Sequence, residues 1–350
     1  LKSISRSKAH ANVIQSTLLD CLAPSSLSRH VRISTAINGF EGCHHSEIIF
    51  HTRSVSFLLR VYQSLPVIKQ LSDIRRTLAS LPQYIQVMKT ASVIQALAAI
   101  KASDPRYADP RRLLVHGAQY WSQNYEDGMI AEIFRRIGTT SRTFLEIGVG
   151  DGSENNTTAL LATGWSGWWI EGSATCCETI TRRLSTMPNI ASRLKVRQAF
   201  VAAENIPALL TELGVPDKID LFSLDIDLNT YHVWAALKSF RPRVVVVEYN
   251  ASLPPDQAWI HPYEADGVWD RTQAFGASLK AYELLAKKFG YNLVGCDILG
   301  VNAFFVRDDL MADKFAAPFT AENHYEPARY HLHCRWGHTS KFFGEAHKIA

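Results

Sequence analysis

The chain has 350 residues, of which 47% are apolar and 20% charged. This composition is typical of globular proteins and excludes collagen-like and low-complexity chains. The formal net charge of +4 gives no electrostatic reason to expect a nucleic-acid partner, which would need clustered basic residues. No apolar run reaches the roughly 18 residues that span a bilayer. Six cysteines in a chain of this length do not make a disulfide scaffold, and they favour a reducing, cytoplasmic location.

The first 112 residues differ from the rest of the chain in composition and in the spacing of their apolar residues. Residues 1–54 are rich in Ser and His without a clear period, and we expect them to be poorly ordered. Residues 55–112 predict a helical extension, with Pro66 and Pro82 expected to start or break its segments. The extension could cap a substrate, join two chains, or simply pack on the core domain. Its apolar residues recur at steps of three or four, as in Leu65, Ile68, Leu71 and Ile74.

From residue 113 to residue 310 the pattern changes to alternating strands and helices. Such alternation predicts a doubly wound, mostly parallel α/β sheet, and the short spacing between the last two strands predicts an antiparallel hairpin. Five strands with crossovers and a closing hairpin are typical of the Rossmann-like class I methyltransferase fold, which has seven strands. Residues 311–350 are expected to form a tail packed on this domain. The predicted strands are 143–149, 167–171, 195–201, 221–225, 244–249, 291–296 and 303–307.

A glycine-rich turn follows the first predicted strand, where residues 146–152 read EIGVGDG. Gly148, Gly150 and Gly152 let the backbone turn sharply and approach a ligand without a clash from a Cβ atom. In a βαβ unit such a turn lies at the carboxyl edge of the sheet, where ligands bind. The second predicted strand ends about 20 residues later in Glu171, an acid placed to accept hydrogen bonds from ribose hydroxyls. The sequence therefore predicts a nucleoside-binding site.

Acidic residues around this turn indicate which nucleoside it binds. The dinucleotide fingerprint GxGxxG has its third glycine where this chain has Ser153. Asp151 and Glu154 would repel a pyrophosphate at the start of the next helix, but they suit a cofactor that carries a sulfonium and an ammonium group. Glu146 adds to the same negative field, and we count it among the cofactor-binding residues. These features favour S-adenosylmethionine over NAD.

Polar side chains also follow the fourth and fifth predicted strands. Asp225 and Asp227 come at the end of the fourth, His232 follows them, and Glu248 and Asn250 end the fifth. Because the ends of parallel strands face one crevice, we expect these residues to converge near the transferred methyl group. A hydroxyl acceptor needs a base for its proton, so Asp225, Asp227, Glu248 and His232 are candidate catalytic residues. Asn250 is a candidate substrate contact.

Other roles stay open at these strand ends. Oxygen ligands from two strands could hold Mg²⁺ or a similar hard cation, although we favour carboxylates that act as base or positioning groups. Asp227 and Asn229 could instead cap the helix that follows. His261, in a loop expected near the crevice, is a candidate substrate contact or an ordinary surface residue.

Several stretches of the chain share motifs with one known family. They read SQNYED at 122–127, EIGVGDG at 146–152, ENNT at 154–157, GWSGWWIE at 164–171, DID at 225–227 and VEYN at 247–250. Together they make residues 118–307 resemble the FkbM-like methyltransferases. The resemblance implies a class I fold, S-adenosylmethionine as the cofactor, and O-methylation of hydroxyls on polyketides, sugars or similar small molecules.

The resemblance also implies roles for individual residues. Gly148, Gly150, Gly152 and Glu171 match the cofactor-binding positions, and Asp225 matches a position that lines the site. Leu228 stands where the family often has a glycine, so we expect this loop of the substrate pocket to differ in shape.

The sequence thus favours an S-adenosylmethionine-dependent methyltransferase with a small-molecule or glycan acceptor. One alternative is an NAD-dependent oxidoreductase, because such enzymes also bind their cofactor at a glycine turn within a βαβ unit. Another is a non-catalytic binding module that keeps the methyltransferase fold. No motif identifies the acceptor or indicates an oligomeric state.

Overall fold

The computed structural model describes residues 30–32, 49–51 and 66–334, and the side chains of residues 70–334. The chain divides into two units, residues 1–86 and residues 87–350. In the first unit, strands β1 (His30–Arg32) and β2 (Ile49–His51) pair antiparallel. Apart from these two strands, the expectation about residues 1–54 lies outside the described residues.

A single helix, α3 (Pro66–Ser103), accounts for most of the predicted helical extension. Pro66 occupies its first position, where a missing backbone N–H costs nothing. Pro82 lies inside the helix, so the prediction that it breaks the helix is wrong. Proline removes one backbone hydrogen bond and crowds the carbonyl four residues earlier, but the other hydrogen bonds of this 38-residue helix remain. No helix among the described residues is both long and apolar enough to cross a membrane.

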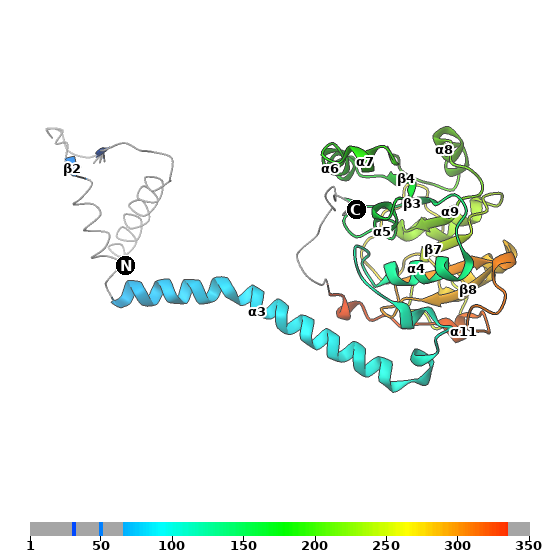
Figure 1. The fold of residues 1–350 in the computed structure, drawn as a ribbon, viewed down its shortest axis with the longest axis horizontal. Coiled ribbons are helices and arrows are strands. Elements are labelled where there is room, and N and C mark those ends of the chain that lie inside the picture. The colour runs from blue at the N-terminus through cyan, green and yellow to red at the C-terminus, as the bar shows by residue number, and fades with distance from the viewer. Residues whose placement is uncertain (1–29, 33–48, 52–65, 335–350) are drawn as a thin grey trace, which may run out of the picture. The chain divides into compact units, whose positions relative to one another are not determined.

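Seven strands of the second unit form one sheet with a single reversed strand (Figure 1). The order across the sheet is β5-β4-β3-β6-β7-β9-β8. Neighbours from β5 to β7 pair in parallel, whereas β9 is antiparallel to both β7 and β8. The strands are β3 (Thr143–Ile147), β4 (Ser166–Glu171), β5 (Leu194–Gln198), β6 (Leu221–Leu224), β7 (Val244–Glu248), β8 (Tyr291–Cys296) and β9 (Asn302–Arg307).

This strand order is that of the class I methyltransferase fold, and it confirms the predicted Rossmann-like architecture with a mostly parallel seven-stranded sheet and a closing hairpin. The chain leaves β3 toward β4 and β5 on one side and later returns to β6 and β7 on the other. Such a reversal opens a crevice at the carboxyl ends of the two central strands, and ligands of open α/β sheets bind there. The fold therefore directs the search for a site to the ends of β3 and β6.

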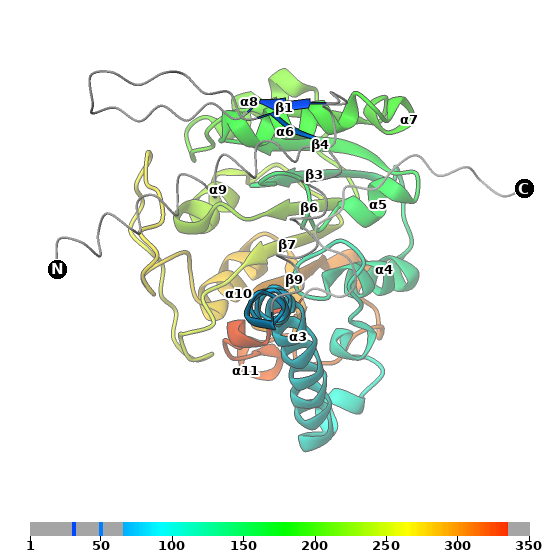
Figure 2. The ribbon, with the colours of Figure 1, turned by 90° about the vertical axis from the view of Figure 1, so that its left-hand side faces the viewer.

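Helices cover both faces of the sheet (Figure 2). Helices α4 and α5 lie on one side of the strands, and α9 and α10 lie on the other. Each face has its own apolar cluster, with Ile133 and Leu161 in one and Trp234 and Leu285 in the other. The sheet is thus buried on both sides, which explains why its strands are nearly continuous apolar runs. The helices are α4 (Glu126–Ile137), α5 (Thr158–Ala162), α6 (Ala174–Leu184), α7 (Pro188–Ala191), α8 (Ile206–Leu213), α9 (Thr230–Ala236), α10 (Leu279–Lys288) and α11 (Ala321–His324).

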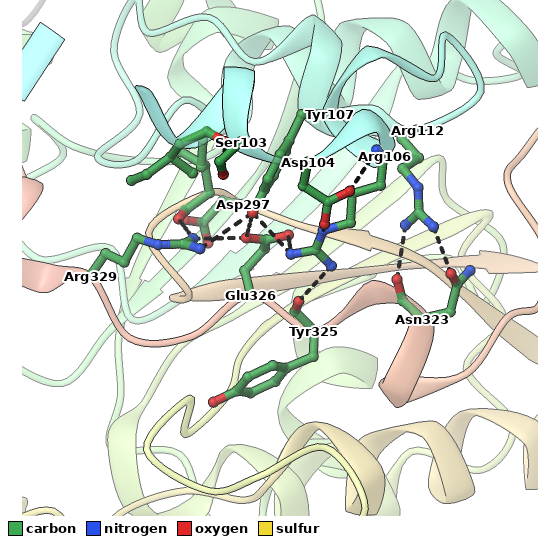
Figure 3. A network of polar contacts seen from close by, with 12 residues as sticks. Ser103, Asp104, Arg106, Tyr107, Arg112, Asp297, Asn323, Tyr325, Glu326 and Arg329 are labelled. Atoms are coloured by element: carbon green, nitrogen blue, oxygen red, sulfur yellow. Dashed lines mark hydrogen bonds and ion pairs between the residues drawn. The ribbon is translucent and has the colours of Figure 1, made fainter. Parts of the chain in front are cut away.

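A buried polar network joins the segment after α3 to the segment after α11 (Figure 3). The Glu326 carboxylate accepts hydrogen bonds from the Tyr107 hydroxyl at 2.8 Å and from Arg329 at 2.7 Å, and Arg106 lies 2.8 Å from it. The Tyr249 hydroxyl donates to the Glu326 carbonyl at 2.5 Å. This last bond fixes Tyr249, the residue that follows the end of β7.

The second unit also contains short helical turns. They are η1 (Pro105–Ala108), η2 (Leu113–His116), η3 (Asp227–Asn229), η4 (Asp308–Leu310) and η5 (Tyr330–Leu332).

Candidate functional site

The turn after β3 requires glycine at its first position. Gly148 has a φ of +84°, and a Cβ atom there would lie 1.6 Å from the Asp225 carbonyl oxygen. This close approach brings the end of β3 against the end of β6. Gly150 has a φ of +53°, and a Cβ built there meets no atom within 4 Å. The turn therefore presents open backbone rather than side chains.

Glu171 at the end of β4 is tied to this turn through backbone amides. The Gly150 N–H donates to its Oε2 at 2.7 Å, and the Ser173 N–H donates to its Oε1 at 2.8 Å. Each carboxylate oxygen can accept more than one hydrogen bond. Glu171 is therefore held in place while it keeps acceptor capacity for a ligand.

A cavity of about 350 Å³ lies at the ends of β3, β4 and β6. Ligand pockets typically measure about 300–1,000 Å³, so this volume suits a small molecule. Four residues predicted from the sequence line it together: Gly148, Glu171, Asp225 and Asp227. The other predicted residues are not among its lining residues: Glu146, Gly150, Gly152, His232, Glu248, Asn250 and His261.

Three carboxylates meet at the edge of this cavity, and two of them, Asp225 and Asp227, line it. Each of Asp225, Asp227 and Glu248 can place one oxygen within 4.8 Å of an oxygen of the other two. Asp225 follows β6, Glu248 ends β7, and the parallel pairing of these strands brings them side by side. Asp227 has a φ of +55°, a conformation that is uncommon for a residue with a side chain and that recurs at functional sites.

The carboxylates of this cluster resist ionisation. Burial, followed by the negative charge of Asp227, raises the pKa of Asp225 to about 6, while a hydrogen bond with Glu248 opposes the rise. Burial and the charges of Asp225 and Asp227 hold the pKa of Glu248 well above its ordinary value. The pKa of Asp227 is also raised by burial. Each carboxylate of the cluster therefore holds its proton more tightly than an exposed acid does, and Asp225 and Glu248 lie close enough to interact through a hydrogen bond.

The Glu146 carboxylate bonds to the start of α5 and does not line the cavity. Its carboxylate accepts hydrogen bonds from the Asn156 N–H at 2.9 Å, the Thr157 N–H at 3.2 Å and the Asn155 side chain at 3.3 Å, and the Thr157 hydroxyl also donates to it. These bonds occupy N–H groups that have no partner at the start of a helix. Burial raises the pKa of Glu146 to about 7. The sequence predicts that Glu146 binds the cofactor, whereas in the structure its carboxylate is hydrogen-bonded to other groups of the protein.

Asp151, in the glycine turn, has a cationic partner. Arg183 of α6 lies 3.1 Å from its carboxylate. The pair offsets the negative charge that the sequence alone assigns to this turn. Repulsion of a pyrophosphate by Asp151 is therefore a weaker argument than the sequence suggests, and the strand order is the stronger ground for separating the two cofactors.

Three other candidate residues hold the loop between β7 and α10. His232 Nε2 lies 2.8 Å from the His261 carbonyl oxygen. The buried Asn250 side chain donates to the Gln273 and Phe275 carbonyls at 2.8 and 3.0 Å. The half-buried His261 ring contacts the Pro262 carbonyl at 2.8 Å. These side chains hold the loop of residues 251–278 in its conformation. They affect the cavity only indirectly, because other residues of that loop line it.

The cavity also contains residues that the sequence did not single out. Phe200 follows the end of β5, so the strand-end rule that found Glu171 could have found it too. Asn229 is buried next to the acidic cluster and donates to the Glu264 carbonyl at 2.6 Å. Val268 and Trp269 come from the loop after β7, and no sequence pattern marks them. Exposed apolar side chains therefore stand at the cavity mouth, with 49% of Phe200 and 38% of Trp269 accessible to solvent.

Comparisons with known proteins bear on the fold. No family model and no curated protein matches this chain. Among solved structures, it is similar to a magnesium protoporphyrin IX methyltransferase from Synechocystis PCC 6803 with bound S-adenosylmethionine, at 11% identity, 52% of this chain, 77% of that chain and a TM-score of 0.35.

Two further solved structures illustrate the range of methyltransferases found. An O-methyltransferase from Bacillus cereus in complex with S-adenosylhomocysteine is 19% identical over 48% of this chain and 72% of that chain, with a TM-score of 0.30. A glycopeptide N-methyltransferase with S-adenosylmethionine is 14% identical over 51% of this chain and 86% of that chain, with a TM-score of 0.31. Scores this low carry no argument about chemistry, and the fold assignment rests on the strand order.

Proposed function

We propose that this protein is an S-adenosylmethionine-dependent methyltransferase that methylates a hydroxyl group of a small molecule or sugar. The observation that carries the proposal is the cavity at the sheet reversal, which Gly148, Glu171 and Asp225 line together. The FkbM-like motifs at the same strand ends support it, and membership of that family is part of the proposal.

The residues around the cavity fit such a cofactor. The open backbone at Gly150 leaves room for a ligand to lie against the turn. Glu171 would accept hydrogen bonds from the ribose hydroxyls, because its carboxylate is fixed by two amides and retains acceptor capacity. Phe200, at the end of the next strand, offers an apolar surface for a base. When bound, S-adenosylmethionine supplies an electrophilic methyl group next to these residues.

The acidic cluster would handle the proton of the acceptor. Asp225 lines the cavity, and its pKa of about 6 leaves it ionised at neutral pH. An ionised carboxylate with a pKa near the working pH is suited to accept a proton from a hydroxyl. Glu248, which does not line the cavity, would act as a positioning residue by donating a hydrogen bond to Asp225. Asp227 would face the acceptor from the same cavity wall.

An oxidoreductase that uses NAD is less well supported. The reversed strand β9 between β7 and β8 departs from the crossover that continues a standard dinucleotide fold. A non-catalytic module would keep the cofactor cavity but would not need three half-buried carboxylates gathered next to it. The cluster of Asp225, Asp227 and Glu248 therefore favours an enzyme.

Calorimetric titration separates these functions. We expect S-adenosylmethionine and S-adenosylhomocysteine each to bind once per chain, and NADH not to bind. If neither sulfur compound binds at about 1 mM, which corresponds to only about 4 kcal/mol of binding free energy, the proposal is wrong. Saturable binding of NADH alone would favour the oxidoreductase.

The acceptor class can be tested with methyl-labelled S-adenosylmethionine. Panels of hydroxyl and amine compounds of matched carbon skeleton should show label transfer to the hydroxyl compounds. Asp225→Asn should bind S-adenosylhomocysteine but lose transfer by at least about 100-fold, the scale typical of general-base removal. Transfer to amines alone would contradict the O-methylation part of the proposal and leave the cofactor assignment intact.

A further inference from the structure

One stripe of helix α3 presents large apolar side chains to solvent. Six of them, each between 42% and 70% exposed, follow one another at alternating steps of three and four residues. Apolar residues on a protein surface usually occur singly, so a continuous row of this kind marks a contact surface. We call this row the seam. The seam consists of Leu71, Ile74, Leu78, Leu81, Ile85 and Met88.

The last part of the same helix is packed differently. Val93 is 4% exposed and Leu97 is 8% exposed, and both belong to an apolar cluster of the second unit. In proteins, most of the stability of a helix comes from burial of its apolar face. Among residues 70–334, no side chain buries the seam to the same degree. The seam therefore has room for a partner.

The spacing of the seam indicates what kind of partner covers it. Alternating steps of three and four residues average 3.5, the period at which helices wind around each other as a coiled coil. Leu71 takes position a of the heptad and Ile74 takes position d, and the later seam residues take these two positions in turn. A seam confined to positions a and d is narrow and fits one partner helix. Because such a seam is complementary to itself, a second copy of α3 supplies that helix.

The residues beside the seam also suit a second copy. In a parallel pair of helices, position g of one helix lies against position e of the next heptad of the other. The facing pairs are then Gln70 with Arg75, Thr77 with Pro82, and Tyr84 with Lys89. No like charges meet in this arrangement, and the Lys89 amine can lie over the Tyr84 ring.

We infer that residues 71–88 of α3 form a parallel two-stranded coiled coil with the same residues of a second copy of this chain. Burial of the seam on both helices removes on the order of 1,000 Å² from solvent. Stable specific interfaces bury about 1,200–2,000 Å², and smaller ones are typical of transient contacts. We therefore expect reversible dimerisation with a dissociation constant on the order of 10 to 100 µM. The inference does not rest on the proposed methyl transfer.

Sedimentation velocity of the full-length chain, at concentrations from about 1 to 500 µM, tests the inference by mass action. The average mass should rise from that of one chain to that of two. Leu78→Asp places a charge inside the seam and should weaken dimerisation by at least about 100-fold. Ile74→Asp is an independent second variant with the same expected effect. The matched control is Val87→Asp, because Val87 is 61% exposed on the same helix but stands outside the seam, and it should dimerise like wild type.

A further variant tests the parallel arrangement. Gln70→Glu should tighten dimerisation about threefold, because each new carboxylate lies against Arg75 of the other copy and exposed ion pairs contribute modestly. An unchanged or weaker affinity contradicts the parallel pairing. Circular dichroism shows whether each variant keeps its helix. At the low micromolar concentrations of an unfolding experiment, the chain is a monomer and its seam is exposed.

Two results overturn the inference. One is a wild-type chain that stays monomeric over the whole concentration range, or that forms an assembly larger than two. The other is equal dimerisation by wild type, Leu78→Asp and Ile74→Asp. If a monomeric wild type sediments with phosphatidylserine vesicles and Leu78→Asp does not, the seam binds a lipid surface instead. None of these results bears on binding of S-adenosylmethionine.

Discussion

Two glutamates on neighbouring parallel strands show how position decides the role of a single residue. Glu146 lies one residue before the end of β3 and is 5% exposed, so its carboxylate bonds to the start of α5. Glu171 is the last residue of β4 and lies at the cavity. Both are acids near strand ends in the sequence. Only the residue beyond the last buried position of its strand is free to meet a ligand.

The buried Glu146 should make stability depend on pH. Its pKa is about 7 in the folded protein and near 4.5 when unfolded, so the folded state holds the proton more tightly. This contribution is complete below about pH 4.5, and it is lost as the pH rises to about 7, by roughly 3 kcal/mol. Urea unfolding of wild type and Glu146→Gln at a series of pH values measures it.

In this comparison Glu146→Gln should lack the downward slope between pH 4.5 and 7, because a glutamine amide does not titrate. The two proteins should therefore be similar in stability at pH 4.5, while the variant gains relative stability at pH 7. Parallel pH profiles of the two proteins would contradict the buried, protonated state of Glu146.

At the scale of elements, the strands were the most predictable part of the chain. Each predicted strand matches an observed one, because strands buried on both faces are continuous apolar runs. Predicted and observed ends coincide or differ by at most three residues; the largest difference is in β5, which stops at Gln198 where the predicted strand continues to Val201. Glu171 and Asp225 were predicted for the same reason, since they directly follow such runs. Side chains that stand on the loop after β7, such as Trp269, follow no period and could not be predicted.

Helix α3 is packed unevenly along its length. Leu97, near its end, is 8% exposed and belongs to an apolar cluster of the second unit, whereas Leu78 is 58% exposed. Leu97→Ala should lower the free energy of unfolding by about 2–4 kcal/mol through loss of buried area and the cavity left behind. Leu78→Ala should change it by less than about 0.5 kcal/mol.

Both substitutions exchange one good helix former for another, so helix propensity contributes little to the difference. Chemical denaturation at equal protein concentration measures the two variants side by side. An equal loss for Leu78→Ala would mean that this part of α3 is covered in solution, and it would contradict the exposed state described here.

At the scale of the whole molecule, two segments far apart in the sequence of the second unit, residues 104–112 and 323–329, are joined to each other by hydrogen bonds and ion pairs. Tyr107 and Arg106 come from η1, and Glu326 and Arg329 come from the segment after α11 (Figure 3). The same segment holds Tyr249, the neighbour of Glu248. The network therefore links these two segments to the strand that carries one member of the acidic cluster.

Loss of the Glu326 side chain should weaken the attachment between these two segments and so lower the stability of the unit. Glu326→Ala would leave Tyr107, Arg106 and Arg329 without their shared acceptor, and we expect the free energy of unfolding to fall by roughly 3 kcal/mol. Burial holds the pKa of Glu326 above its ordinary value despite both arginines, so this expectation rests on three lost donors rather than on full ionic charge.

The matched control is Glu212→Ala, which removes the acid of an exposed ion pair with Arg197 at 2.7 Å. That change should cost less than about 0.5 kcal/mol, because exposed pairs contribute little. Equal effects of the two substitutions in urea unfolding would show that the network does not hold the two segments together.

The affinity of Glu171→Gln for S-adenosylhomocysteine tests the central claim most directly, because Glu171 joins the glycine turn to the cavity. Relative to wild type, calorimetry should show a loss of about 10- to 100-fold, the value of one or two hydrogen bonds to a charged acceptor. Glu178→Gln, an exposed change on the neighbouring helix, should bind like wild type. If folded Glu171→Gln binds S-adenosylhomocysteine as tightly as wild type, this cavity is not the cofactor site.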